Sequence, residues 1–462
     1  MIPITPLILA VALFMEQMDS TVIATSLPAI ASDLGTSPVA LKLAVTAYLV
    51  ALAIFIPISG WMSDRFGAKN VFRAAIVVFA LGSIACAFAG SIHAFVLARF
   101  FQGIGGSMMT PVGRLLLVRS TPRNQLVSAM AWLTIPALVG PITGPPLGGF
   151  LTTYLSWHWV FWINVPISVL GLALVTKYLP EGEARTPRPI DIPGFFLSAI
   201  AFAGIDFGMS VISFPTLPVT VGYATIATGF VAGLAYLAHA RRARHPLLDP
   251  QMFRRYPLFR TAILGGSLFR IGIGAIPFLL PLMLQVGFGL TPFQSGMLTF
   301  ITAVGALASK FIAQWVFQTF GFRNALTITA VLGAATTAIN GTFAPATPTL
   351  LLMGLLFAGG VLRSVTFTGV NAMVFSDVDD ADSAQATAIN SVLQQISLAT
   401  GVALAGAVLD VAGRASGQTL GLGDFHLAFF VVSGVSALAT LVFAALPAEA
   451  GSAVSGHRRP AE

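Results

Sequence analysis

Charged residues and cysteines are scarce in this chain. Asp, Glu, Lys and Arg make up only 9% of the 462 residues, whereas about 25% is usual in soluble proteins. A single cysteine, Cys86, excludes a disulfide framework. The sequence also contains no phosphate-cradling loop, metal-ligand cluster or nucleophile constellation. We therefore expect no enzymatic activity, no cofactor, no metal site and no ATP-driven pump.

Apolar residues are abundant instead. They account for 56% of the chain, and the mean hydropathy is +0.87, which predicts an integral membrane protein with a lipid bilayer as its partner. The net charge of +7 would favour a nucleic-acid partner only if a soluble fold carried a basic patch. No such patch is visible, so no nucleic acid is expected.

Fourteen apolar segments are long enough to cross a hydrocarbon core of about 30 Å. The fold class predicted is therefore an all-α membrane protein with fourteen transmembrane helices. The segments lie near residues 7–31, 41–62, 71–90, 93–118, 126–152, 159–179, 193–213, 218–239, 259–285, 293–316, 324–343, 349–375, 384–410 and 425–446.

Basic residues predict the orientation, because Lys and Arg accumulate in cytoplasmic loops. The loops on one side of the membrane hold only Lys42 and Arg414. Both termini lie on the other, basic side and are therefore expected in the cytoplasm. Four loops on the other side hold fourteen of the 24 Lys and Arg residues, namely Arg65, Lys69, Arg73, Arg119, Arg123, Lys177, Arg185, Arg188, Arg241, Arg242, Arg244, Arg254, Arg255 and Arg260.

The chain repeats itself at one constant offset. Residues 66–70 (FGAKN) return as 320–324 (FGFRN), residues 35–38 (GTSP) as 289–292 (GLTP), and the glycine pair at 105–106 as 359–360. Such repeats are typical of transporters built from two six-helix halves. We predict halves at residues 1–180 and 241–448, an inserted and peripheral helix pair at 181–240, and a disordered cytoplasmic tail at 449–462.

The first apolar segment contains two carboxylates, Glu16 and Asp19, on one helix face. A charge at mid-bilayer costs roughly 2.5 to 3.5 kcal/mol on insertion scales. The face that carries them must therefore look into a helix bundle or a watery cavity. This arrangement predicts a transport pathway.

Residues 60–69 (GWMSDRFGAK) closely resemble the cytoplasmic signature of the major facilitator superfamily. The resemblance implies a conformational latch in which Asp64 faces the start of the helix near Ser383 and stabilises the outward-facing state. A solvated charged loop is the alternative. The latch residues expected are Gly60, Asp64, Arg65, Gly67 and Lys69.

Two further segments resemble motifs of the same superfamily. Residues 97–106 (LARFFQGIGG) include Arg99, which the resemblance associates with proton coupling. Residues 140–149 resemble the motif that distinguishes antiporters, although close helix packing would need the same residues. The antiporter motif residues are Gly140, Pro141, Gly144, Pro145, Gly148 and Gly149.

Residues 18–28 (MDSTVIATSLP) and 157–166 (WHWVFWINVP) are similar to segments of the fourteen-helix drug:proton antiporter family, and the resemblance covers nearly the whole chain. It implies the inner membrane of a bacterium. The family has a neutral or small residue near the position of Glu16, so a role for this extra carboxylate does not carry over. Proton coupling is expected at Asp19, Glu16 and Arg99.

The second half contains cations within its apolar segments, Arg270 and Arg363, with Lys310 between them. The repeat makes Arg270 the counterpart of Glu16, so we predict that these two residues face each other across the pathway. The alternative is that each makes polar contacts within its own half. The substrate cavity is expected to include Arg270, Arg363, Asn371 and Gln394.

Together these features predict proton-coupled efflux of drugs or amphiphilic small molecules by alternating access, with the proton gradient as energy source and no cofactor. The mixed charges favour neutral, zwitterionic or anionic substrates. The alternative is a dedicated exporter or importer of one metabolite, such as an organic anion or a metal chelate, and a membrane enzyme or sensor ranks third. The partners expected are a small-molecule substrate, protons and lipid, and the molecule is expected to be a monomer.

Overall fold

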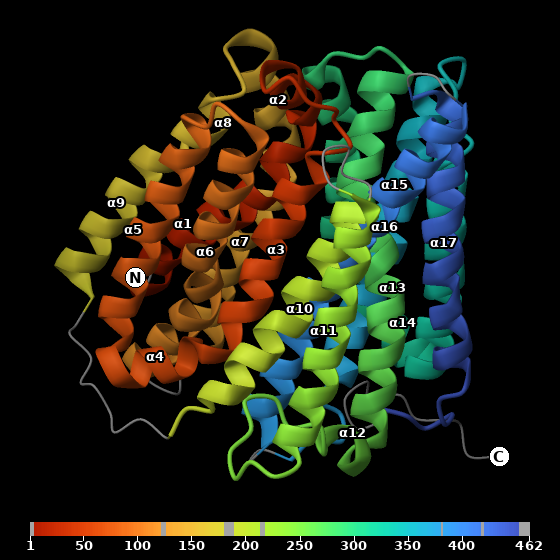
Figure 1. Cartoon of the computed structure of the whole chain (residues 1–462). Coiled ribbons are helices and arrows are strands. Elements are labelled where there is room, and N and C mark those ends of the chain that lie inside the picture. The colour runs from red at the N-terminus through yellow and green to blue at the C-terminus, as the bar shows by residue number, and fades with distance from the viewer. Residues whose placement is uncertain are drawn as a thin grey trace.

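The computed structural model describes residues 4–121, 126–179, 189–212, 218–379, 382–416 and 420–451. Every regular element within these ranges is helical (Figure 1), which confirms the all-helical class. The basic residues Arg123, Arg185 and Arg188, and the predicted tail beyond residue 451, lie outside the described residues.

The first half contains helices whose ends follow the apolar runs of the sequence closely. They are α1 (Ile4–Val22), the short η1 (Ile23–Thr25), α2 (Leu27–Asp33), α3 (Lys42–Phe55), the short η2 (Ile56–Ile58), α4 (Ser59–Phe66), α5 (Ala68–Ala87), α6 (Ile92–Ser120), α7 (Leu126–Tyr154), α8 (Trp159–Trp162) and α9 (Asn164–Tyr178).

Two helices follow the first half, and the second half then repeats the pattern. The inserted pair is α10 (Ile192–Ile212) and α11 (Val219–Ala240). The second half consists of α12 (Met252–Arg255), α13 (Pro257–Leu282), η4 (Met283–Gly287), α14 (Pro292–Asn340), α15 (Thr349–Met373), α16 (Ser383–Ser416) and α17 (Leu422–Ala444).

Eleven helical segments in the described residues are long and apolar enough to cross a membrane. One of them, α14, contains a residue with non-helical dihedral angles at Gly321 and includes both predicted spans 293–316 and 324–343. The eleven do not include α6 and α7, which are 29 residues long each. The count of fourteen spans therefore stays a prediction.

The backbone repeats where the sequence repeats. Gly35 and its counterpart Gly289 have φ angles of 61° and 70°, and Gly67 and its counterpart Gly321 have φ angles of 83° and 69°. These left-handed conformations are strained for any residue with a Cβ atom. The equivalent loops of the two halves thus turn in the same way, as the repeat predicts.

The two halves stand side by side, the first at the left of Figure 1 and the second at the right. We call the end of the bundle that holds α4 and α12 the α4 end, and the end that holds α2 and α8 the α2 end (Figure 1). The inserted helix α10 packs against α3 of the first half and α16 of the second. Helix α10 of the inserted pair therefore contacts both halves, and the peripheral position expected for the pair stays a prediction.

Hydrogen bonds between the halves lie at the α2 end. Gln285 donates its side-chain amide to the carbonyl oxygen of Thr25 at 2.9 Å. The backbone N–H of Phe293 donates to the hydroxyl of Thr153 at 3.1 Å. These contacts tie η4 to η1 and α14 to α7, so they close the passage between the halves at this end.

An ion pair at the α2 end also joins the halves. The Lys42 ammonium at the start of α3 lies 3.4 Å from a carboxylate oxygen of Asp410 on α16. The alkyl chain of Lys42 crosses α16 at Gly406, where a Cβ atom would meet its carbons. Lys42 is only 1% exposed, so it is a buried interface residue and not the loop residue that we expected.

Candidate functional site

A cavity of about 510 Å³ lies between the two halves. Its wall combines α1, α3, α6 and α7 of the first half with α13, α14, α15 and α16 of the second. Most of the lining is apolar. The polar and charged lining residues include Glu16, Gln17, Tyr48, Arg99, Lys310, Arg363, Gln394 and Gln395.

Glu16 faces this cavity but does not pair with Arg270. Its carboxylate accepts a hydrogen bond of 2.7 Å from the Thr110 hydroxyl of α6, and the side chain is largely buried. No ion pair of Glu16 is found among the described residues. Our expectation that Glu16 faces Arg270 across the pathway is therefore wrong for this conformation.

Arg270 is bonded entirely within its own half. Its guanidinium donates to the amide oxygens of Asn390 at 3.1 Å and Asn371 at 2.8 Å, and it lies over the ring of Phe367 at 5.3 Å. Neither Arg270 nor Asn371 is among the residues that line the cavity. The symmetry of the repeat places Arg270 and Glu16 on equivalent helices, but amides of the second half accept from both terminal nitrogens of the arginine.

Asp19 lies behind the cavity wall, with no exposed surface, and three donors surround its carboxylate. Arg99 donates to one oxygen at 2.7 Å. Gln102 and Asn164 donate to the other at 2.9 Å and 2.7 Å. Asp19 and Arg99 thus form a buried ion pair.

The Asp19 network extends to α3 and α5. Gln102 accepts from Arg99 at 2.6 Å and donates to Ser83 at 2.7 Å. The Arg99 guanidinium lies 4.4 Å from the centre of the Tyr48 ring, on the cavity wall. Gln102 and Asn164 lie inside the motifs that we compared by resemblance, but the sequence analysis assigned them no role. The sequence signal for both residues was an amide side chain inside an apolar spanning segment, where it needs a polar partner.

Two cations of the second half line the cavity. The terminal nitrogens of Arg363 have no hydrogen-bond partner among the described residues, although the side chain is only 6% exposed. Lys310 donates to the Thr368 hydroxyl at 2.7 Å. Gln394 lines the cavity as predicted. The cavity wall is thus richer in cationic than in anionic side chains.

The antiporter motif makes close helix contacts beside the cavity. A Cβ atom at Gly140, Gly144 or Gly148 would come closer than 3.0 Å to atoms of α1. Gly149 makes a similar approach to α14 of the other half, where the carbonyl of Pro145 in turn lies against Gly296. These glycines let α7 lie flat between α1 and α14, which is the packing role that the sequence analysis left open.

Pro141, the remaining motif residue, lines the cavity itself. The motif therefore contributes both to the wall of the cavity and to the contact between the two halves.

The loop signature forms bonds within the first half. Asp64 pairs with Arg119 at the end of α6, at 2.7 Å. Lys69 is buried and donates to the carbonyl oxygens of Thr176 and Leu179 at 3.2 Å and 2.6 Å. A lysine near the last carbonyls of a helix stabilises that end, so Lys69 fastens α5 to the end of α9.

The predicted latch between Asp64 and the start of α16 at Ser383 is not formed in this conformation. Gly67 has the positive φ angle that its turn requires, and Gly60 and Arg65 are exposed. The latch remains a prediction.

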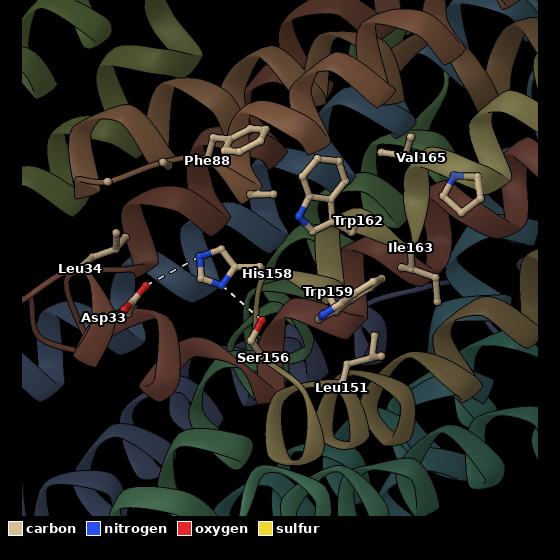
Figure 2. A pocket seen from close by; sticks show the side chains of 14 residues that line it. Asp33, Leu34, Phe88, Leu151, Ser156, His158, Trp159, Trp162, Ile163 and Val165 are labelled. Carbon is tan, nitrogen blue, oxygen red and sulfur yellow. Dashed lines mark hydrogen bonds and ion pairs between the residues drawn. The ribbon is translucent and has the colours of Figure 1, made fainter.

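A larger pocket, of about 1090 Å³, lies at the α2 end of the first half (Figure 2). Figure 2 shows His158 between Asp33 and Ser156, and Trp159 and Trp162 on the wall. All of its lining residues belong to the first half. Because transport needs a site that both halves share, we take the cavity between the halves as the candidate site.

Comparison with known proteins identifies the family. A family model described as "Major Facilitator Superfamily" matches residues 9–259 and 262–460. The chain belongs to the Major Facilitator Superfamily. Relatives named "Putative multidrug resistance protein MdtD" from Salmonella heidelberg (strain SL476) and Pectobacterium carotovorum subsp. carotovorum (strain PC1) are each 35% identical over 447 residues. The match covers 95% of this chain and 94% of the Salmonella protein, and 96% and 95% for the Pectobacterium protein.

Solved structures confirm the superfamily fold at low identity. A D-xylose-proton symporter has a TM-score of 0.71 at 15% identity, with 96% of this chain and 98% of that chain covered. The human organic anion transporter MFSD10 (TETRAN) has a TM-score of 0.62 at 15% identity, with coverage of 96% and 99%. The chain is thus a multi-pass membrane transporter and not an enzyme, as the sequence predicted.

Proposed function

We propose that this transporter exports drugs or other amphiphilic small molecules across a bacterial inner membrane in exchange for protons, by alternating access. The proposal includes fourteen spanning helices, six in each half and two in the inserted pair. The α4 end would face the cytoplasm, because the basic residues of the described loops gather there. The relatives named as multidrug resistance proteins support drugs as the substrates.

The observation that carries this proposal is the position of the two carboxylates on α1. Glu16 lies on the cavity wall, and Asp19 lies directly behind that wall in an ion pair with Arg99, which itself lines the cavity. A substrate in the cavity and a proton on Glu16 therefore act in the same space. Loading one changes the electrostatic environment of the other, which is the requirement for exchange.

The Asp19–Arg99 pair couples this site to the helix packing. A proton on Asp19 would neutralise the carboxylate and weaken the bond to Arg99, while Gln102 and Asn164 could still bond its oxygen. Arg99 would then be free to turn toward the cavity. One charge that crosses 100 mV supplies about 2.3 kcal/mol, enough to bias the rocking of the two halves.

A second candidate, a dedicated transporter of one organic anion or metal chelate, rests on the charge of the wall. Arg99, Lys310 and Arg363 line the cavity, whereas Glu16 is its acidic lining residue. The terminal nitrogens of Arg363 lack a protein partner among the described residues. An anionic substrate would supply one.

Transport by the purified protein in vesicles under an imposed pH gradient tests both candidates. We expect uptake of ethidium into inverted vesicles to follow the gradient, and Glu16→Gln and Asp19→Asn to abolish that dependence. Glu449→Gln, which alters an exposed carboxylate outside the spans, is the control and should transport normally. Ethidium movement that ignores the gradient would refute antiport. Strict preference for citrate over ethidium would favour the second candidate.

A further inference from the structure

The inserted helix α10 is hydrogen-bonded to both halves of the transporter. Thr46 of α3 and Ser210 of α10 lie 3.4 Å apart, hydroxyl to hydroxyl. On the next turn of α10, a carboxylate oxygen of Asp206 accepts from the Thr400 hydroxyl of α16 at 2.8 Å. Thr46, Ser210 and Asp206 are all fully buried. Helix α10 therefore bridges the line along which the halves must separate.

Asp206 is a carboxyl group with little to stabilise a charge. Its second carboxylate oxygen is buried without a hydrogen-bond partner among the described residues. An isolated ionised carboxylate in such a place is costly, and a buried group of this kind usually becomes neutral by taking up a proton. The surroundings of Asp206 in this packed conformation therefore favour the protonated form.

The charged groups around α10 do not change this conclusion. Lys42 and Asp410 pair with each other, and His239 bonds Asp191; none is bonded to Asp206 in the described part of the chain. The side chain of Arg414, further along α16, is outside the described set. The titratable residues with described side chains on the helices packed against α10 are Lys42 and Tyr48 on α3, Asp410 on α16, and Tyr223, Tyr236 and His239 on α11.

The position of Asp206 links it to opening of the α2 end. Thr46 lies one turn from Lys42, to whose carbonyl oxygen its hydroxyl donates at 2.9 Å. The Thr46–Ser210 contact is thus next to the ion pair that joins α3 to α16. When those helices separate, α10 cannot remain bonded to both, so one side of α10 becomes open to water from the α2 end.

We propose that Asp206 is a proton-binding site that controls closure of the α2 end. Asp206 is protonated when α3, α10 and α16 are packed together, and it exchanges its proton with the solution at the α2 end when they part. Closure requires the protonated form, because packing would otherwise bury the bare charge. The proton enters and leaves on one side, so it adds pH dependence without adding to the protons exchanged for substrate. This inference rests on the alternating access of the proposed function, but not on its substrate or its coupling.

The test measures opening directly, without transport. Spin labels on Ser37→Cys and Ala346→Cys, two exposed positions on the first and second halves, report the distance across the α2 end in nanodiscs. Cys86 is fully buried and can remain. We expect the ratio of open to closed molecules to rise with pH by up to about tenfold per pH unit, as for one titrating group. Asp206→Asn should keep the α2 end closed over this pH range and remove the contribution of Asp206 to the dependence.

Controls separate Asp206 from its surroundings. Ser210→Ala on the same helix leaves the carboxyl group intact and should retain the pH dependence. Thr400→Val removes the donor to Asp206 and should move the pH of half-opening, which keeps the test decisive if Asp206→Asn does not fold. Unchanged pH dependence in Asp206→Asn or in Thr400→Val would overturn the proposal. The proposal would also be overturned if the ratio of open to closed molecules changed when choline replaced Na⁺ but did not change with pH. Ethidium transport is assayed apart, so its failure would refute the proposed function alone.

Discussion

Removing one partner of the buried pair of Asp19 and Arg99 should cost far more stability than removing one partner of the exposed pair of Asp64 and Arg119. Both pairs have the same separation of 2.7 Å, but the first is 0% and 1% exposed and the second 35% and 25%. Arg99→Gln leaves a buried carboxylate with only two amide donors, so we expect a loss of about 3–5 kcal/mol in the free energy of unfolding. Arg119→Gln should cost at most about 1 kcal/mol, because solvent replaces the partner.

Unfolding in detergent micelles, followed by tryptophan fluorescence, measures the difference between these two variants. The double variant Asp19→Asn with Arg99→Gln contains no buried charge at this site. Its loss should therefore be smaller than the sum of the single losses, with a coupling of about 0.5–3 kcal/mol. If Arg99→Gln and Arg119→Gln cost the same, or if the double variant shows simple additivity, burial does not determine the strength of the pair.

Four further substitutions test the geometry. Glu16→Gln should remove the ethidium accumulation that the imposed pH gradient drives, which is up to about tenfold per pH unit if one proton is exchanged per ethidium, as vesicle uptake would show; full accumulation would exclude Glu16 as a proton carrier. Gly148→Ala should cost about 1–3 kcal/mol in unfolding measurements, because the added methyl group meets α1. A Cβ atom at Gly60 would have no atom within 4 Å, so Gly60→Ala should be tolerated. Equal losses of unfolding free energy in Gly60→Ala and Gly148→Ala would contradict the packing argument. The hydrogen bond from the Tyr256 hydroxyl lowers the pKa of Asp382 in the folded protein. This contact therefore stabilises the fold fully above the pKa of the carboxyl group in the unfolded chain. The stabilisation disappears as the pH falls through the pKa in the folded protein. Tyr256→Phe should reduce thermal stability at neutral pH but not at strongly acid pH, and a constant difference would refute this linkage.

The sequence alone predicted the helices and the family well, for a physical reason. A spanning helix needs about twenty apolar residues whatever it packs against, so the predicted span 349–375 agrees with α15 at Thr349–Met373. The polar surroundings of the two carboxylates on α1 were predictable on the same basis, because a charge inside an apolar segment is costly without polar partners. The repeat was visible because its loop glycines need the same backbone angles in both halves.

The partners of the buried charges could not be predicted in this way. The repeat relates Arg270 to Glu16 by helix position, but a hydrogen bond depends on which side chains lie within about 3 Å. Arg270 bonds Asn371 and Asn390 instead, amides that come from two distant segments. Likewise, nothing in the sequence near Asp206 indicates Thr400 as its donor, because that contact depends on how the inserted pair packs.

The slot that Gly406 offers to Lys42 has a consequence for how such chains can diverge. A side chain at position 406 would occupy the space that the lysine methylenes now fill. A relative with a larger residue at position 406 would need a shorter or differently placed cation at position 42. The carboxylate at position 410 would then lack its ion-pair partner and would no longer be selected. These three positions should therefore change together in evolution, so that substitutions at one are accompanied by substitutions at the others.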